Sequence, residues 1–352
     1  MVLSTSGLIL SSKRTYQLRA LVITSRPRIS ALDFWALTPD ASRFFLEVLH
    51  MNTALSSIVS QLDLEQIELN LFRGQSENLG TPRVFGGQVI GQALVAALRT
   101  VSERHCHSLH GYFLRPGDPN KPILYEVDRI RDGKSFATRR VVAIQSGEAI
   151  FNMACSFQVL EDGLSHARTM PDVPKPDDLP DERELIEARL DSLPEAMREM
   201  MQRERPIELK RVEPIDYANP KKMPPKQHTW FRAKYPLGDD VALHQCMLAY
   251  ASDMGILSTC TLPHGRSFMT GLMTASLDHA MWFHRPFSFD EWILFEQDSP
   301  ASGGARGFNR GTMYTEQGVL VATVAQEGLI RDVAGEGVFD WTKQVGQPAS
   351  VR

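Results

Sequence analysis

Residues 81–101 read Thr-Pro-Arg-Val-Phe-Gly-Gly-Gln-Val-Ile-Gly-Gln-Ala-Leu-Val-Ala-Ala-Leu-Arg-Thr-Val. From Gly87 onward this stretch is almost wholly apolar, and it contains small residues such as Gly91 and Ala96. A helix that is apolar on all sides must be buried on most of its faces. The sequence therefore predicts a central helix that the rest of its domain encloses.

The residues after this helix alternate between apolar and polar side chains. Strand candidates cover 125–130 and 137–144, and a further strand returns over 149–159. The Gln-Ser-Gly-Glu segment at 145–148 is typical of a hairpin turn. The first part of the chain is thus predicted to be one helix followed by antiparallel strands.

The same pattern returns later in the chain. Residues 241–253 are a second mostly apolar helix candidate with small side chains. Phe-His-Arg-Pro at 283–286 repeats Phe-Leu-Arg-Pro at 113–116 with an offset of 170, and 310–326 repeats 139–155 with an offset of 171. Matching offsets in separate motifs indicate an internal duplication.

The duplication favours one architecture. A helix wrapped by a curved antiparallel sheet buries its whole circumference, which explains why neither helix has a polar face. This is the hot-dog arrangement, and two copies in one chain make a double hot-dog of the α+β class. The two sheets of such a pair can join edge to edge, which removes two exposed edges.

The chain divides into four predicted segments. The repeats span 51–160 and 227–345, and a linker at 161–226 joins them; it holds ten of the chain's 21 prolines and one charged helix candidate over 181–204. Residues 1–50 are expected to be an irregular extension. Because its first 32 residues contain no Asp or Glu, an organelle transit peptide is the alternative.

Composition excludes several classes of protein. The chain has 352 residues, of which 43% are hydrophobic, and its 38 basic and 42 acidic residues give a net charge of −4. No positive field is therefore expected to hold nucleic acid or a membrane surface, and no apolar run reaches the ~18 residues of a membrane helix. None of the four cysteines forms a Cys-x-x-Cys pair, which argues against a disulfide framework and a zinc ribbon. We expect a cytoplasmic protein, or a mitochondrial one if the extension is a transit peptide.

Seven motifs stand in a fixed order along the chain. They are Leu-Phe-Arg-Gly-Gln-Ser at 71–76, Val-Phe-Gly-Gly-Gln-Val-Ile-Gly-Gln-Ala at 84–93, Phe-Leu-Arg-Pro-Gly-Asp at 113–118, Tyr-Ala-Ser-Asp at 250–253, Ser-Leu-Asp-His-Ala-Met-Trp-Phe-His-Arg-Pro-Phe at 276–287, Ala-Arg-Gly-Phe at 305–308 and Gln-Glu-Gly at 326–328. Together they resemble the acyl-CoA thioesterase II family of double hot-dog hydrolases, from about residue 55 to residue 331.

The resemblance implies a function in lipid and fatty acid metabolism, the hydrolysis of fatty acyl-CoA. The family's catalytic Asp, hydroxyl residue and Gln match Asp253, Ser276 and Gln326. No cofactor and no metal are implied, and a homodimer or homotetramer is expected. As chemistry, a carboxylate can accept a proton from water, while a hydroxyl and an amide can hold that water in place, so no covalent intermediate is required.

The duplication adds an argument of its own. At the offsets above, Ser276 corresponds to Cys106 and Gln326 to Cys155, and aligning the two helices on their glutamines puts Asp253 opposite Ala96. The first repeat thus lacks all three polar groups. We therefore predict one active site per pair of repeats.

Other residues are predicted to contact the substrate. They are Gly87, Gln88, Arg115, His279, Arg306 and Arg310, with the arginines as candidates for the phosphates of CoA. Two alternatives stay open. Asp278 and His279, or His284, can be interpreted as an acid–base pair of a hot-dog hydratase or dehydratase, and a non-catalytic acyl-CoA-binding protein is the other possibility.

Overall fold

The computed structural model describes residues 62–76, 81–187, 198 and 206–333. All of these belong to one compact unit, Met51–Arg352. The predicted extension at 1–50 lies outside the described residues. So does most of the helix predicted over 181–204, of which α3 (Glu182–Glu187) is described.

The first repeat is a helix lying against an antiparallel sheet. Its elements are β1 (Glu65–Glu68), β2 (Leu71–Gly74), α2 (Gly86–Leu98), β3 (His105–Phe113), β4 (Ile123–Asp132), β5 (Phe136–Gln145) and β6 (Glu148–Gln158). The predicted helix, strands and hairpin are confirmed. Ser146 and Gly147 both have positive φ, 53° and 83°, as a tight hairpin turn requires. Ten of the thirteen residues of α2 are buried, which matches its lack of a polar face.

The second repeat has the same order of elements with additions. It consists of β7 (Ile207–Arg211), β8 (Lys226–Ala233), α5 (Val241–Ser252), the 3-10 helices η4 (Ile256–His264) and η5 (Phe268–Thr270), β9 (Leu272–Ser276), β10 (Asp278–Phe283), β11 (Ile293–Gly303), β12 (Arg306–Thr315) and β13 (Leu320–Asp332). Asp240 caps α5 by accepting hydrogen bonds from the N–H groups of Ala242 and Leu243.

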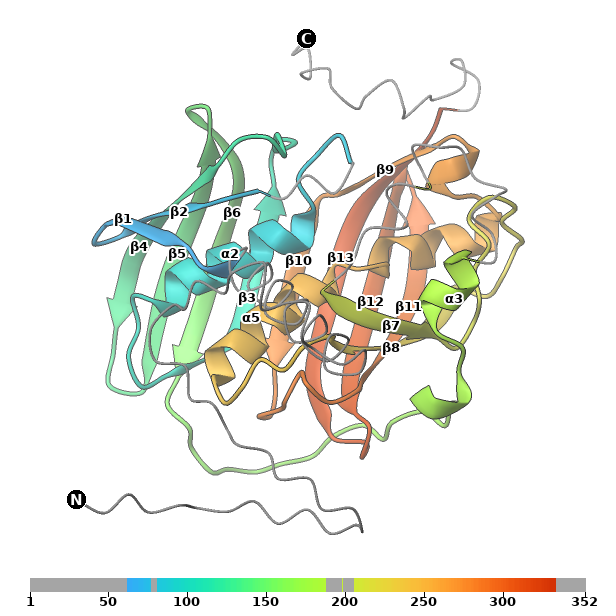
Figure 1. The fold of residues 1–352 in the computed structure, drawn as a ribbon. Coiled ribbons are helices and arrows are strands. Elements are labelled where there is room, and N and C mark those ends of the chain that lie inside the picture. The colour runs from blue at the N-terminus through green and yellow to red at the C-terminus, as the bar shows by residue number, and fades with distance from the viewer. Residues whose placement is uncertain (1–61, 77–80, 188–197, 199–205, 334–352) are drawn as a thin grey trace, which may run out of the picture. The chain divides into compact units, whose positions relative to one another are not determined.

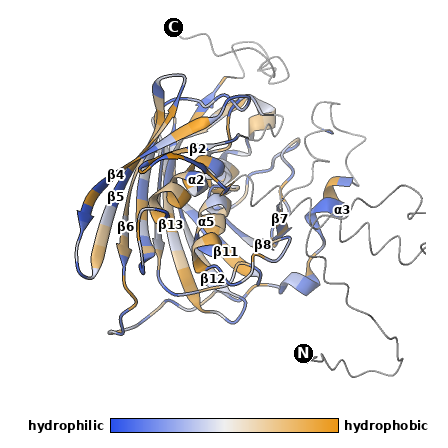
Figure 2. Cartoon of the chain, turned by 60° about the vertical axis from the view of Figure 1, so that its left-hand side comes forward, coloured by the Kyte–Doolittle hydropathy of each residue, from blue (hydrophilic) through white to orange (hydrophobic). Residues whose placement is uncertain are grey.

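The two repeats share one continuous sheet, with α2 and α5 on the same face (Figure 1, Figure 2). The strand order is β1-β2-β4-β5-β6-β3-β10-β13-β12-β11-β8-β7. The repeats join where β3 pairs with β10, and there His110 stands opposite Ala280, a position 170 residues later. Equivalent positions therefore meet at the join, so the repeats are related by an approximate two-fold axis. The predicted double hot-dog with edge-to-edge sheets is confirmed.

The strand registers refine the predicted alignment. The exposed ion pair of Arg140 with Asp128 recurs as the pair of Arg310 with Asp298, both at an offset of 170. Arg310 therefore corresponds to Arg140, and the predicted match of Arg310 with Arg139 is wrong by one residue. The offset becomes 171 only at the following hairpin, because the bulge before the turn falls at a different place in each repeat.

The two central helices pack with their directions reversed. A Cβ added to Gly87, near the start of α2, would lie 2.2 Å from the carbonyl oxygen of Tyr250 near the end of α5. Only glycine permits so close an approach of two backbones. The N-terminus of α2 consequently lies beside the C-terminus of α5, and this contact builds the site described below.

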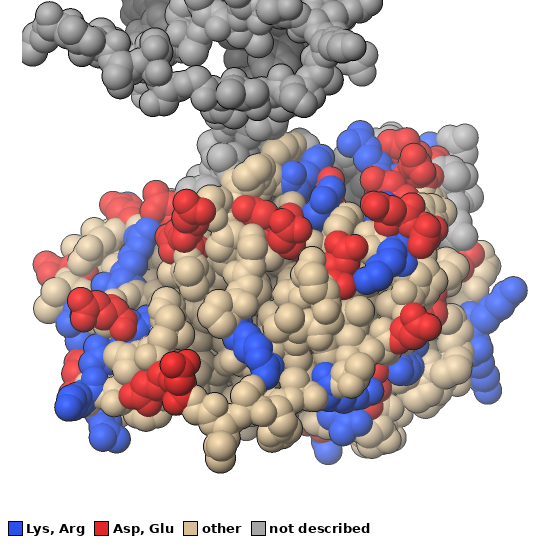
Figure 3. All heavy atoms as spheres, turned by 90° about the horizontal axis from the view of Figure 1, so that it is seen from below, with Lys and Arg blue, Asp and Glu red and all other residues tan. Residues whose placement is uncertain are grey.

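The predicted linker covers the outer face of the second half of the sheet. Met170, Val173, Leu179 and Val212 pack on a buried cluster of Trp230, Trp292, Leu294 and Tyr314. The linker also contributes β7, which pairs with β8 at the edge of the sheet. Within the described residues no helix is long and apolar enough to cross a membrane. On the face shown in Figure 3, basic and acidic side chains are interspersed.

Candidate active site

Three side chains from the second repeat meet at the end of α5. Asp253 is the C-cap residue of that helix, Ser276 ends β9 and Gln326 lies in β13. Gln326 Nε2 donates to Asp253 Oδ1 at 3.0 Å and to Ser276 Oγ at 2.8 Å. Ser276 Oγ donates to Asp253 Oδ1 at 3.2 Å. The sheet thus brings together three residues that span 73 positions in sequence.

The first repeat supplies the other side of this carboxylate. The backbone N–H of Gly87, at the N-terminus of α2, donates to Asp253. A Cβ on Gly86 would lie 2.6 Å from Asp253 Oδ2 and 2.9 Å from the Phe113 ring, so Gly86 must lack a side chain. The positive end of the α2 dipole faces the carboxylate at this point.

Burial nevertheless dominates the acidity of Asp253, which is 9% exposed. Desolvation raises the pKa of its carboxyl from the ordinary 3.8 to about 6, and the hydrogen bonds from Gln326, Ser276 and Gly87 lower it only in part. A carboxylate with a pKa near 6 is a stronger base than an exposed one and is still ionised near neutral pH.

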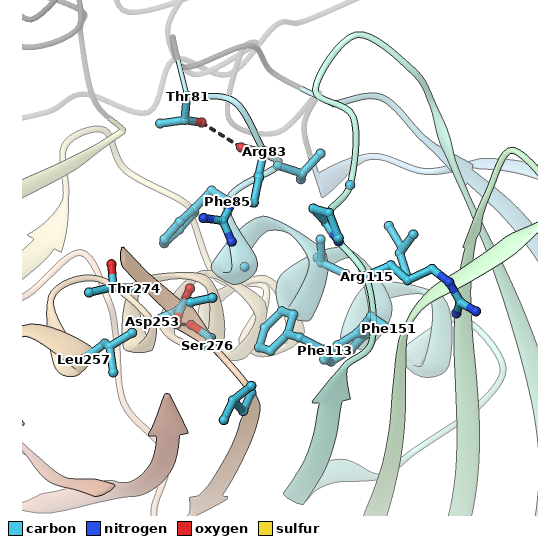
Figure 4. Close-up of a pocket in the computed structure, with 18 of the residues that line it drawn as sticks. Thr81, Arg83, Phe85, Phe113, Arg115, Phe151, Asp253, Leu257, Thr274 and Ser276 are labelled. Atoms are coloured by element: carbon cyan, nitrogen blue, oxygen red, sulfur yellow. Dashed lines mark hydrogen bonds between the residues drawn. The ribbon is translucent and has the colours of Figure 1, made fainter. Parts of the chain in front are cut away.

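An apolar cavity opens beside the carboxylate (Figure 4). Its volume is about 600 Å³, and both repeats line it. Phe85, Val89, Phe113 and Phe151 come from the first repeat, and Leu257, Phe268 and Leu272 from the second. Asp253 and Ser276 form part of its wall, whereas Gln326 lies behind them and is fully buried. The cavity can therefore hold a hydrocarbon chain with its reactive end at Asp253.

Comparisons with known proteins agree with this geometry. Two family models match, one described as acyl-CoA thioesterase over residues 198–329 and one as acyl-CoA thioesterase N-terminal domain over residues 75–158. Acyl-coenzyme A thioesterase 8 of Mus musculus is 46% identical over 284 residues, which cover 78% of this chain and 88% of that protein. Acyl-CoA thioesterase 2 of Haemophilus influenzae is 40% identical over 283 residues, which cover 80% and 99%. The chain belongs to the acyl-CoA thioesterase II family.

A solved structure of the family has the same fold. An acyl-CoA thioesterase II from Mycobacterium marinum superposes with a TM-score of 0.65 at 44% identity, covering 79% of this chain and 99% of that one. The protein is accordingly an acyl-CoA thioesterase that hydrolyses acyl-CoA, and this prediction is confirmed.

The first repeat of the thioesterase has no second copy of the polar constellation. The register puts Cys106 where Ser276 stands and Cys155 where Gln326 stands, because Cys155 pairs with Arg139 as Gln326 pairs with Asn309. Both cysteines are buried, and burial raises the pKa of the Cys155 thiol to about 12. Neither thiol is a nucleophile at neutral pH.

The residues predicted to contact substrate differ in where they lie. Arg115 lines the cavity mouth, and Gly87 touches the catalytic carboxylate. The other four lie outside the cavity lining. The side chain of Gln88 is buried and donates to the carbonyl of Gln75, and His279 is buried behind Gln326. The other two residues form ion pairs, Arg306 with Glu327 and Arg310 with Asp298.

The geometry does not form the acid–base pair considered from the sequence. Asp278 and His279 are neighbours in β10, so their side chains point to opposite faces of the sheet. Asp278 accepts from the backbone N–H of Glu327, and His284 contacts Thr323 Oγ1. The sequence interpretation also missed Arg83, which lines the cavity. Its signal was a lone basic residue directly before an apolar motif.

Proposed function

We propose that this thioesterase cleaves fatty acyl-CoA by direct attack of a water held by Asp253, Ser276 and Gln326. One observation carries the proposal: the three hydrogen-bonded side chains stand at the wall of an apolar cavity. The ionised carboxylate is the only one of the three that can take a proton from water. The hydroxyl and the amide hold both water and carboxylate in place.

The reaction then balances without a cofactor. The water oxygen bonds to the thioester carbon while one water proton passes to Asp253, and the carbonyl electrons move to oxygen. The N-terminus of α2, whose Gly86 lines the cavity, stabilises that oxyanion. The C–S bond breaks as the intermediate collapses, and Asp253 returns its proton to the sulfur. The products are a fatty acid and the free thiol of CoA.

The phosphates of CoA require a cation at the cavity mouth, and Arg83 fits this role best. Burial lowers the pKa of the Arg83 guanidinium, and no charged group among the described residues compensates it. Arg115 lines the same cavity but is already paired with Glu148 at 3.0 Å and with the carbonyl of Ala149. In Figure 4 its guanidinium extends away from Asp253. A phosphate bound at Arg83 would neutralise a half-buried charge.

Two measurements test the proposal. Thiol release with acyl-CoAs of increasing chain length should rise with chain length until the cavity is filled. A hydratase would instead change the acyl group and leave the thioester intact, and a non-catalytic binder would release no thiol above background. The Arg83→Gln variant should raise the KM for acyl-CoA about 10- to 100-fold, the effect of losing a charge-assisted hydrogen bond.

The control separates phosphate recognition from a general defect. N-acetylcysteamine thioesters of the same acyl chain carry no phosphates, so Arg83→Gln should leave their kcat/KM unchanged. Arg115→Gln should alter neither substrate's KM appreciably. Equal losses on both substrates would contradict the assignment of Arg83. The proposed assembly is a homodimer or homotetramer in the cytoplasm, or in mitochondria if residues 1–50 target it, which light scattering and cell fractionation can test.

A further inference from the structure

A buried imidazole stands behind the catalytic residues and contacts none of the cavity. His279 is 1% exposed and lies in β10. Its Nδ1 is 2.7 Å from Gln326 Oε1, and its Nε2 is 2.8 Å from Ser252 Oγ. Ser252 directly precedes Asp253 at the end of α5. The imidazole therefore connects the helix that carries the carboxylate to the amide that holds it.

The amide of Gln326 has two possible orientations with nearly the same shape. In one orientation its NH₂ group faces Asp253 and Ser276 and can donate to both. In the other its carbonyl oxygen would face the ionised carboxylate 3.0 Å away, and both donated hydrogen bonds would be lost. Shape alone does not choose between them, so the choice must come from the group on the far side of the amide.

That group is His279. An imidazole with a proton on Nδ1 can meet only the Oε1 end of the amide, which leaves the NH₂ end for the carboxylate. Burial lowers the pKa of His279 to about 4, so the ring is neutral and carries a single proton. The Ser252 hydroxyl, which can donate to Nε2, favours placing this proton on Nδ1.

The first repeat has an apolar residue at the equivalent position. Ala280 pairs with Ala325, so His279 stands opposite Gln326, just as Leu109 stands opposite Cys155. The imidazole is thus present only where an amide needs orienting. The strand accepts leucine at this register in the other half of the same chain, and leucine is therefore a suitable substitution.

We propose that His279 is a positioning residue, which holds the Gln326 amide in the orientation that serves Asp253 and the attacking water. The proposal rests on the water mechanism above. Its effect is on the geometry of the reacting groups and not on substrate affinity, because the imidazole does not reach the cavity.

The test uses three substitutions at this position. His279→Leu should lower kcat about 10- to 100-fold with an unchanged KM, the effect of misplacing a positioned group. Asparagine keeps a donor where Nδ1 stands, whereas glutamine keeps one where Nε2 stands. His279→Asn should therefore retain a clearly higher kcat than His279→Gln. This comparison does not depend on whether the leucine variant folds.

A double variant separates positioning from general stability. If His279 acts only through the amide, His279→Leu combined with Gln326→Ala should be no slower than Gln326→Ala alone. Multiplied losses in the double variant, or equal kcat for the asparagine and glutamine variants, would overturn the proposal. Full activity of Gln326→Ala and Asp253→Asn would instead refute the water mechanism. The two failures are therefore distinguishable.

Discussion

Replacing Asp253 with asparagine separates the catalytic role of the carboxylate from the free energy of burying it. The substitution preserves the shape of the side chain and an acceptor for Gln326 and Ser276 but removes the base. We expect kcat to fall about 10²- to 10⁴-fold, the usual contribution of a positioned acid–base group. In the wild type, kcat/KM should rise with pH through about 6, the pKa of this carboxyl.

The same substitution should change stability in a direction that depends on pH. The folded-state pKa of Asp253 is raised from 3.8 to about 6, so the native state binds this proton more tightly than the unfolded chain. Its contribution to stability is present below about pH 3.8 and is lost as the pH rises through 6. A pKa difference of this size corresponds to about 3 kcal/mol.

The asparagine variant does not titrate, so it escapes this loss. Its free energy of unfolding relative to the wild type should therefore increase by about 3 kcal/mol between about pH 4 and pH 8. Any constant penalty, such as the contact of the new amide with the N–H of Gly87, shifts both ends of the range equally. Urea denaturation of both proteins across this range measures the difference. A pH-independent difference would refute the buried-carboxylate argument, and near-normal turnover in the folded variant would refute the catalytic assignment.

The same geometry leads to three further predictions. Ser276→Thr should keep most of the kcat because the hydroxyl is retained, whereas Ser276→Ala should lose it in the same thiol-release assay. Gln326→Ala should lower kcat more mildly than Asp253→Asn, while Cys155→Ala at the equivalent place in the first repeat should leave kcat unchanged and lower the free energy of unfolding by about 1 kcal/mol; equal losses of turnover would contradict a single site per pair. Gly86→Ala should reduce kcat at least about tenfold, because its Cβ would lie 2.6 Å from Asp253 Oδ2, and unchanged kinetics would show that α2 can shift at no catalytic loss.

Much of the site was predictable because its residues lie in recognisable motifs. Asp253, Ser276 and Gln326 were assigned by resemblance, and the structure brings their side chains within hydrogen-bond distance. The substrate-contact residues were less predictable. An arginine on a strand reads the same whether it meets a phosphate or a neighbouring carboxylate, as Arg310 does with Asp298. Only the surroundings of each guanidinium distinguish the paired Arg310 from Arg83.

The sequence by itself determined the local elements and their duplication, because both depend on periodicity and spacing along the chain. An apolar helix, alternating strands and repeated offsets require no knowledge of distant contacts. The tertiary structure alone decided which ends of these elements meet. The reversed packing of α2 on α5 brings Gly87 to Asp253, and the register of β10 beside β13 brings His279 to Gln326. These contacts depend on backbone approach and on one-residue register, which no sequence period specifies.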